Sequence, residues 1–454
     1  MIEAAEIVES LGPLLLECQP GRAQRFRRPA IDSRTVGRGD LFVALRGAQR
    51  DGQEFVGVAV EGGARGVLVH ELPERLAADV AAFVVPDTLV ALQRLATARR
   101  EHRRAKVIGV TGSVGKTSTK ELIAAVLGTH YPVLKSEANY NTEIGLPLTL
   151  LELTHRHRRA ALEMAMRAPG EIRTLCEIAR PDVGVVTNVG VTHMETLGTI
   201  EAIADAKAEL VESLGADGVA VLNADDPLVR PMAGRTRARV VLYGTSPDAD
   251  VRATEIESRG LDGVSFRLYW QGESTPVHVS ELGAHSVSNA LAAAAVASAD
   301  GMSLRETAAA LEGARVPSRI RVLRGRGGCT ILDDTYNASP ASMEAALGLL
   351  KEVPARRHIA VLGDMKELGP VEREAHLEVG GRAAETADVI HTVGELGHLI
   401  REAAHAAGHR HAQHWPTTEA ATEAVAGGLD SGDVVLVKAS RAMAFERIVE
   451  ALKE

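Results

Sequence analysis

The segment at residues 106–120, KVIGVTGSVGKTSTK, constrains this chain more than any other. Its apolar start, residues 106–110, predicts a buried strand. A glycine-rich turn at 112–115 comes next, and Lys116 and Thr117 then begin a predicted helix. This order of elements is typical of a phosphate site, because glycines let backbone N–H groups approach the anion and the helix N-terminus carries a partial positive charge.

In such a loop the lysine, Lys116, reaches the outer phosphates and the Thr117 hydroxyl binds Mg²⁺. The match to the full pattern is incomplete, because Val110 stands where a glycine five residues before Gly115 is required. The alternative is a tight strand-to-helix turn with an exposed lysine. We favour a nucleotide site, whose expected residues are Thr111, Gly112, Ser113, Val114, Gly115, Lys116 and Thr117.

Length and composition narrow the class of protein. The chain has 454 residues, which suggests two to four domains. Its net charge of −9 argues against a nucleic-acid partner, and three widely spaced cysteines argue against a disulfide framework. The first residues lack the pattern of a signal peptide, and no run reaches the about 18 apolar residues of a membrane span. We expect a cytoplasmic protein without membrane insertion, and a monomer.

Alternating strand and helix patterns predict an α/β fold with three domains. Residues 1–86 form a small N-terminal α/β unit. Residues 87–315 form a central domain that starts with a linking helix at 88–104 and continues with a mostly parallel sheet, flanked by antiparallel strands at 251–281. From VPSR (316–319) onward the alternation resumes, so residues 316–454 are expected to form a Rossmann-like, doubly wound domain.

Polar residues follow the expected strands of the central domain. Glu163 lies within or near the end of a strand at 158–166, and His193 follows a strand at 182–190. Ligands bind beyond the carboxyl ends of parallel strands, and Mg²⁺ prefers oxygen ligands, so Glu163 is a candidate beside Thr117. A lone histidine in a loop is more often a surface residue, and the pattern around Lys207 favours a solvated helix lysine.

The third domain also collects polar groups at strand ends. Asp333 and Asp334 end one expected strand, and Lys438, Ser440 and Arg441 end another. Paired carboxylates at such a place either cap the next helix or bind a sugar hydroxyl. Both sheets carry polar side chains at the edge where ligands bind, and this indicates a ligand held between the two domains.

Blocks along nearly the whole chain resemble, in order, the Mur ligase family. They are IDSRTVGRGDLFVALRG (31–47), TGSVGKTSTKE (111–121), NYNTEIGLPLTLLEL (139–153), NVGVTHMETLG (188–198), IADAKAEL (203–210), HSVSNALAA (285–293), DDTYNASPASM (333–343), VLGDMKELG (361–369) and VKASRAM (437–443). The blocks at 333–343 and 361–369 resemble the member that adds D-alanyl-D-alanine.

The resemblance implies an ATP-dependent amide ligase of peptidoglycan synthesis, with ATP and Mg²⁺ as cofactors. Its expected partners are UDP-N-acetylmuramoyl-tripeptide and D-alanyl-D-alanine. ATP would phosphorylate the terminal carboxylate of the tripeptide, and the amine of the dipeptide would then attack the acyl phosphate. Metal ions neutralise charge in such phosphoryl transfers.

The resemblance also implies roles for individual residues. The expected catalytic residues are Lys116, Glu163, His193 and Lys207, where Lys207 matches a lysine that is carbamylated. The expected metal ligands are Thr117, Glu163, His193 and Lys207 as its carbamate. The remaining nucleotide contacts are Asn289 for adenine, Arg319 near the nucleotide and Asp334 for ribose. The expected UDP-substrate contacts are Ser33, Arg34, Asn139 and Asn141.

The chain departs from the family pattern at Ala165, Ser286, Ser339 and Ala439, all of which are small. None removes an expected catalytic position. Three alternatives stay open: the tripeptide-forming Mur ligase, a phosphate-loop ATPase or phosphotransferase without ligation, and a non-catalytic nucleotide-binding protein.

Overall fold

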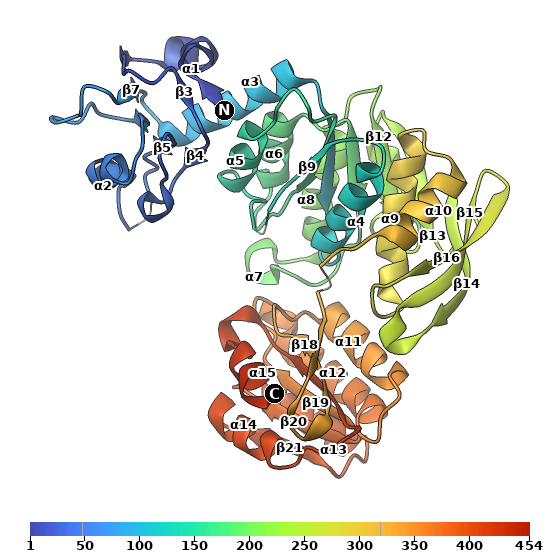
Figure 1. The fold of residues 1–454 in the computed structure, drawn as a ribbon. Helices are drawn as coiled ribbons and strands as arrows, with labels where there is room; N and C mark the ends of the chain where they lie inside the picture. Colours follow the sequence, from blue (N-terminus) through green and yellow to red (C-terminus); the bar gives the residue numbers. More distant parts are fainter. Residues whose placement is uncertain (48, 138, 318) are drawn as a thin grey trace.

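The computed structural model describes residues 1–454 except residues 48, 138 and 318. Three α/β units follow one another along the chain, each built around its own sheet (Figure 1). The expected α/β fold class is therefore confirmed. The domain limits 1–86, 87–315 and 316–454 stay predictions. The predicted boundary segment at 316–319 includes residue 318, which lies outside the described residues.

The N-terminal unit holds a five-stranded sheet in the order β2-β7-β6-β5-β4. Only the edge strand β2 runs antiparallel to its neighbour, and a separate short pair joins β1 to β3. The elements are β1 (Ile2–Glu3), α1 (Ala4–Leu11), β2 (Glu17–Gln19), β3 (Arg25–Phe26), β4 (Pro29–Ala30), η2 (Ser33–Thr35), β5 (Leu41–Val43), α2 (Val56–Glu61), β6 (Gly66–Val69) and β7 (Ala81–Val84).

A long helix, α3 (Thr88–Arg103), joins this unit to the central one (Figure 1). It begins where the Asp87 carboxylate accepts hydrogen bonds from the first free backbone N–H groups, as an N-cap should. On α3, Arg99 is only 1% exposed and pairs with Glu6 of α1 at 2.6 Å. Arg99 also donates to the Leu153 carbonyl of the central unit. One hydrophobic core runs through both units, so they pack as a continuous body.

The central unit contains a nine-stranded sheet in the order β16-β15-β14-β13-β12-β11-β8-β10-β9. Strands β8 to β14 pair with one another in parallel, and β15 and β16 extend the sheet from β14 as an antiparallel flank. The strands are β8 (Lys106–Thr111), β9 (Val133–Lys135), β10 (Arg159–Glu163), β11 (Val183–Val186), β12 (Val219–Asn223), β13 (Arg239–Gly244), β14 (Val251–Ser258), β15 (Val264–Trp270) and β16 (Glu273–Val279).

Helices cover both faces of this sheet, because each buried strand presents alternate side chains to opposite sides. In β8, Val107 joins the core beneath one set of helices while Ile108 and Val110 join the other. The first set is α3, α5 (Gly145–Leu151), α6 (Glu171–Ala179) and α8 (Ile200–Glu212), and the second is α4 (Lys116–Gly128), α9 (His285–Ala299) and α10 (Leu304–Gly313). The carboxyl ends of the parallel strands are thus left open for a ligand.

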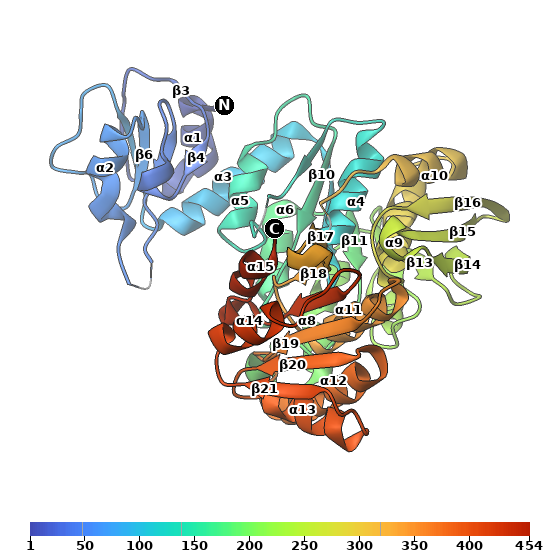
Figure 2. The same cartoon turned by 60° about the horizontal axis from the view of Figure 1, so that its bottom comes forward.

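The C-terminal unit lies against the central one (Figure 2) and holds a six-stranded sheet in the order β17-β18-β22-β19-β20-β21. All neighbours are parallel except β17 and β18. The elements are β17 (Arg321–Arg324), β18 (Thr330–Asp334), α11 (Pro340–Glu352), β19 (His358–Gly363), α12 (Glu372–Thr386), β20 (Val389–Val393), α13 (Gly397–Ala406), β21 (Ala412–Trp415), α14 (Thr418–Ala426), β22 (Val434–Lys438) and α15 (Glu446–Leu452).

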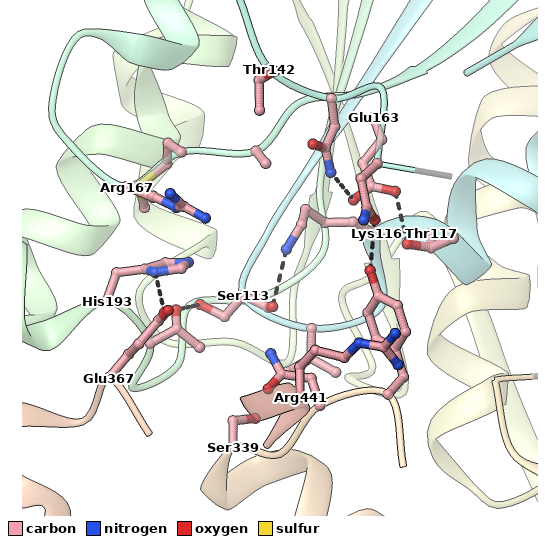
Figure 3. A pocket seen from close by; sticks show the side chains of 18 of the residues that line it. Ser113, Lys116, Thr117, Thr142, Glu163, Arg167, His193, Ser339, Glu367 and Arg441 are labelled. Carbon is pink, nitrogen blue, oxygen red and sulfur yellow. Dashed lines mark hydrogen bonds and ion pairs between the residues drawn. The ribbon is translucent and has the colours of Figure 1, made fainter. Parts of the chain in front are cut away.

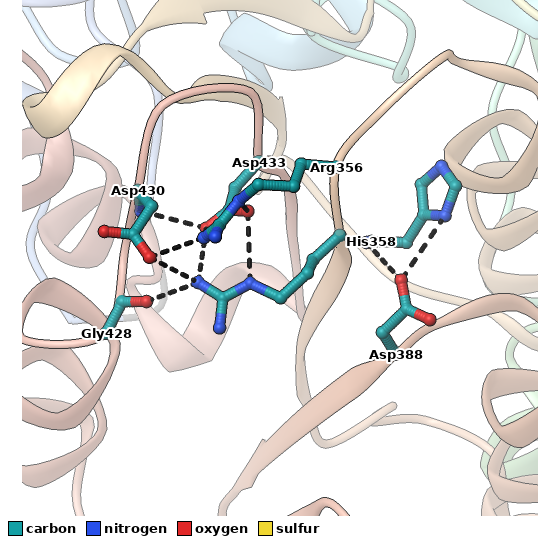
Figure 4. Close-up of polar contacts among 7 residues, drawn as sticks. Arg356, His358, Asp388, Gly428, Asp430 and Asp433 are labelled. Carbon is teal, nitrogen blue, oxygen red and sulfur yellow. Dashed lines mark hydrogen bonds and ion pairs between the residues drawn. The ribbon is translucent and has the colours of Figure 1, made fainter.

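A buried aspartate, Asp433, fixes two of these strands at their amino ends (Figure 4). Asp433 precedes β22, and its carboxylate accepts hydrogen bonds from Arg356 and Arg357, which precede β19. Arg356 also pairs with Asp430. Burial alone would raise the pKa of Asp433, but these hydrogen bonds outweigh it and hold the pKa below its usual range. The two strands pair in parallel from this end, with His358 opposite Val434.

Among the described residues, no helix combines the length and apolar character that crossing a membrane requires.

Candidate active site between the central and C-terminal domains

The glycine-rich loop connects β8 to α4, as the sequence pattern predicts. Gly115 caps α4 with a φ of 86°, in the region that favours glycine. Gly112 has a φ of 146°, and a Cβ on it would lie 1.9 Å from Thr187 Oγ1. Both positions therefore require glycine in this structure.

A second loop, after β11, holds the glycine-rich loop in place. Asn188 binds Val114 twice: its Oδ1 accepts from the Val114 N–H and its Nδ2 donates to the Val114 carbonyl, each at 2.9 Å. Thr187 Oγ1 donates to the same carbonyl at 2.7 Å. Sequence reasoning did not single out Thr187 or Asn188, although the signal was available, since both follow a parallel strand on the edge where ligands bind.

Lys116 folds back over the loop that precedes it. Its Nζ donates to the carbonyls of Gly112 at 2.7 Å and Ser113 at 3.1 Å. Burial lowers the pKa of Lys116, the carboxylate of Glu163 opposes that shift and Arg319 adds to it. The ammonium thus lies within the loop at the start of a helix, where phosphate oxygens bind.

Glu163 is the last residue of β10 and only 4% exposed. Its Oε2 accepts from Thr117 Oγ1 at 2.8 Å, and its Oε1 accepts from Asn141 Nδ2 at 2.9 Å. Among the described residues, no three His, Cys, Asp or Glu side chains gather in a metal-binding arrangement. The hard oxygen donors of Thr117 and Glu163 nevertheless fit Mg²⁺, which commonly takes one or two protein ligands together with phosphate oxygens.

Two further basic groups face Lys116. His193 has a φ of 57° and begins the short helix α7 (Met194–Leu197), and its Nδ1 lies 2.9 Å from Glu367 Oε2 of the C-terminal unit. Burial lowers the pKa of His193; Glu367 opposes the shift, and Lys207 and Lys116 add to it.

Lys207 of α8 is only 2% exposed, so the expectation of a solvated helix lysine, drawn from the local pattern, is wrong. The reason is that α8 packs its Lys207 face onto the sheet and toward the loop. Burial lowers the pKa of Lys207 far below its ordinary value, and the charge of Lys116 adds to the effect. Lowering the pKa of a lysine increases the share of the neutral amine, which is the form that can react with CO₂.

The roles of Asn289, Asp334 and Arg319 as nucleoside contacts stay predictions, and the structure shows where these side chains lie. Asn289 Oδ1 accepts from Thr119 Oγ1 at 3.1 Å and lies close to Gly115. Asp334 Oδ2 accepts from Lys438 Nζ, while its buried Oδ1 has no hydrogen-bond partner among the described residues. Arg319 lies 3.9 Å from that oxygen. An unsatisfied carboxylate oxygen fits a ligand hydroxyl as its donor.

The glycine-rich loop, Glu163, His193 and Arg319 line a cavity of about 890 Å³ between the central and C-terminal units (Figure 3). The predicted site residues that line it are Ser113, Val114, Gly115, Lys116, Thr117, Asn139, Asn141, Glu163, His193 and Arg319. Those that do not line it are Thr111, Gly112, Lys207, Asn289, Asp334, Ser33 and Arg34. Ser33 and Arg34 belong to η2 of the N-terminal unit, where Arg34 pairs with Asp32 at 2.6 Å.

The C-terminal wall of the cavity contributes residues that were not predicted individually. Tyr336 donates from its hydroxyl to Asn139 Oδ1 at 2.6 Å, and the Arg319 guanidinium lies over the Tyr336 ring. The Glu367 carbonyl accepts from the Met194 N–H. These contacts join the two units on both sides of the cavity, and no local sequence pattern indicates them.

The departures from the family pattern are accommodated without strain. Ser339 lies just before α11 and forms a reciprocal cap with Ser342. Ser286 Oγ donates to the Glu281 carbonyl. Ala165 donates its N–H to the Asn141 carbonyl, and Ala439 is fully buried beside Gly363.

Three family models match the chain. The model described as "Mur ligase family, catalytic domain" matches residues 29–100, "Mur ligase middle domain" matches residues 110–297, and "Mur ligase, glutamate ligase domain" matches residues 318–441. A UDP-N-acetylmuramoyl-tripeptide–D-alanyl-D-alanine ligase of Bacillus subtilis is 38% identical over 94% of this chain and 93% of its own length. The chain belongs to the Mur ligase family.

Other Mur ligases support this assignment. The ligase of the same name from Escherichia coli is 35% identical over 93% of both chains. The crystal structure of MurF from Acinetobacter baumannii matches with a TM-score of 0.87 at 30% identity, covering 99% of this chain and 98% of that one. The MurF ligase from Thermotoga maritima in complex with ADP matches with a TM-score of 0.82 at 31% identity, over 94% and 96%.

Proposed function

We propose that this chain is the ATP-dependent ligase that joins D-alanyl-D-alanine to UDP-N-acetylmuramoyl-tripeptide. The observation that carries the proposal is the cavity itself, whose one wall bears the phosphate loop, Glu163 and His193, and whose other wall comes from the C-terminal unit. Curated ligases of that name match the chain over nearly its whole length. A related enzyme was crystallised with ADP, which supports ATP use.

In the first step, a carboxylate oxygen of the tripeptide attacks the γ-phosphorus of ATP, and the bond from that phosphorus to the bridging oxygen of ADP breaks. The products are an acyl phosphate and ADP. The N–H groups of the glycine-rich loop and the start of α4 hold the phosphates. Lys116 Nζ exchanges its two loop carbonyls for phosphate oxygens and stabilises the charge that is transferred.

Mg²⁺ fits this site, since Thr117 and Glu163 supply oxygen donors next to the loop. His193 and a carbamate on Lys207 would hold a second ion. Bound Mg²⁺ would neutralise the phosphate oxygens and so let two anions approach each other. Asn141 keeps Glu163 oriented from the side opposite Thr117.

In the second step, the amine of D-alanyl-D-alanine attacks the acyl carbon and loses a proton. The bond from that carbon to the phosphate oxygen breaks, which gives the amide and inorganic phosphate. Because both units line the cavity, the acyl phosphate would be shielded from water, which would otherwise hydrolyse it.

The N-terminal unit holds the UDP part of the substrate in this proposal. Ser33 and Arg34 lie outside the cavity, which suits a group far from the reacting carboxyl. Asn139 and Asn141 lie at the cavity wall and would meet the substrate between these two ends. Asn289 and Asp334 would contact adenine and ribose. We place the enzyme in the cytoplasm as a monomer.

A reconstituted ligation assay with mass detection tests the proposal. Purified protein with ATP, Mg²⁺, UDP-tripeptide and D-alanyl-D-alanine should yield the UDP-pentapeptide, and phosphate release should require both peptide substrates. Phosphate release without them would instead support an ATPase or phosphotransferase. Ligation of diaminopimelate or lysine to the UDP-dipeptide, in place of this reaction, would support the tripeptide-forming ligase.

A further inference from the structure

Five cationic side chains line the cavity, and four of them already have partners. Lys116 binds the loop carbonyls, Lys366 pairs with the carboxylate of Asp364 at 2.9 Å, and Arg319 and Arg441 each have a carboxylate 3.9 Å away. The fifth cation, Arg167, has no ion pair with any described residue. Its guanidinium points into the cavity from the side of the central unit, as does His193 (Figure 3).

The backbone around Arg167 is fixed relative to Glu163, which ends β10 four residues earlier. The Ala165 N–H donates to the Asn141 carbonyl at 3.0 Å, and the Arg167 N–H donates to Glu171 Oε2 at 2.6 Å. Met166 between them is buried. The guanidinium therefore extends from a rigid base, on the same wall as the phosphate loop.

The cavity must admit an acyl donor that carries more than one carboxylate. The name of a related ligase from Acinetobacter baumannii gives the peptide as alanyl, D-glutamyl and 2,6-diaminopimelate residues. One carboxylate of such a peptide reacts, but the α-carboxylate of the glutamyl residue stays charged, and so does a side-chain carboxylate when the third residue is diaminopimelate. Taking such a group out of water without a partner is costly. Arginine is suited to the task, since its planar fork binds a carboxylate through two parallel hydrogen bonds.

We infer that Arg167 binds a carboxylate of the UDP-tripeptide that does not react, and so positions the reacting one. The inference rests on the proposed ligase function and adds a specificity residue to it. The acyl donor is the favoured ligand because Arg167 lies in the loop that directly follows Glu163, beside which the γ-phosphate is transferred on the proposed function.

Steady-state kinetics of Arg167→Gln and Arg167→Lys test the inference, with UDP-tripeptides that end in diaminopimelate or in lysine. We expect Arg167→Gln to raise the KM for UDP-tripeptide by about tenfold to a hundredfold. The KM values for ATP and for D-alanyl-D-alanine should stay within about twofold. Arg167→Lys should raise the KM for UDP-tripeptide less than Arg167→Gln does. Lysine keeps the positive charge but cannot bind a carboxylate through two parallel hydrogen bonds.

Arg173→Gln is a matched control. Arg173 lies six residues further along, pairs with Glu212 at 3.6 Å and does not line the cavity. This variant also loses one positive charge, and its KM for UDP-tripeptide should equal that of the wild type. Equal melting temperatures for all variants would show that folding is unaffected.

The two tripeptides distinguish the two carboxylates. A rise in KM for both substrates identifies the glutamyl carboxylate, and a rise only for the diaminopimelate substrate identifies the carboxylate of the third residue. An unchanged KM for both, or a rise confined to ATP or to the dipeptide, would overturn the inference. A wild-type enzyme that fails to ligate would instead overturn the proposed function.

Discussion

Replacement of Lys207 by alanine is the sharpest test of the chemistry proposed for the cavity. Lys207 is buried, has no ion pair with any described residue, and faces two other basic groups, Lys116 and His193. As an ammonium it would repel both. As a carbamate, formed when the neutral amine attacks CO₂ and releases a proton, it would instead place a negative charge beside these two basic groups.

The size of the effect follows from this arrangement. Removing one group that stabilises developing charge in an active site typically raises the barrier by about 2.7–4 kcal/mol. Each ~1.4 kcal/mol of barrier changes a rate about tenfold. We therefore expect Lys207→Ala to lower the rate of ligation by about 10²-fold to 10³-fold. Binding of ATP should be largely kept, because Lys116 and the glycine-rich loop remain.

The assay measures ligation rates by mass detection and nucleotide binding by calorimetry, with Lys351→Ala on the exposed face of α11 as the control. Carbon-13 NMR of wild-type protein supplied with labelled CO₂ should reveal a carbamate signal that Lys207→Ala lacks. Full activity in Lys207→Ala, or a wild-type rate indifferent to removal of CO₂, would refute the reasoning.

Three further changes probe other parts of the structure. Gly112→Ala would place a methyl group 1.9 Å from Thr187 Oγ1, so calorimetry should find that ATP binding is lost. Normal ATP binding would contradict the rigidity of the glycine-rich loop. Tyr336→Phe removes the hydroxyl that donates to Asn139. The kcat should fall about twofold to tenfold at an unchanged melting temperature. An unchanged kcat would show that this contact does not matter for turnover. The lowered pKa of Asp433 stabilises the folded state above about pH 4, and this contribution fades as the pH falls through the lowered value. Denaturant titrations should therefore find Asp433→Asn less stable by about 2–3 kcal/mol at pH 7 and the difference smaller near pH 3; an equal difference at both would contradict this origin.

The phosphate loop could be predicted from the sequence because its physics is local. A buried strand, glycines with positive φ and a helix start lie within fifteen residues, and the structure places them so. Glu163 was also within reach, since a carboxylate at the end of an apolar strand needs partners, and it has Thr117 and Asn141.

The contacts between units could not be predicted in the same way. Tyr336 with Asn139 and His193 with Glu367 are separated by well over a hundred residues, and only the packing of two folded units brings them together. The burial of Lys207 arises within the central unit, where α8 packs onto the sheet, and the local sequence pattern does not show it. Arg167 gave no signal in the sequence, because an unpaired arginine in a loop looks the same whether it faces a cavity or bulk water.

The continuous core beneath the N-terminal and central units, tied by Arg99 to Glu6 and to the Leu153 carbonyl, has a consequence for substrate length. Because these two units share one packed interior, the span from η2 to the phosphate loop is set by the fold and cannot contract to suit a shorter substrate. On the proposed assignment, this fixed distance selects the length of the UDP-linked peptide. A UDP-linked peptide one residue too short would leave its carboxyl out of range of the phosphate it must attack, however well its nucleotide end binds.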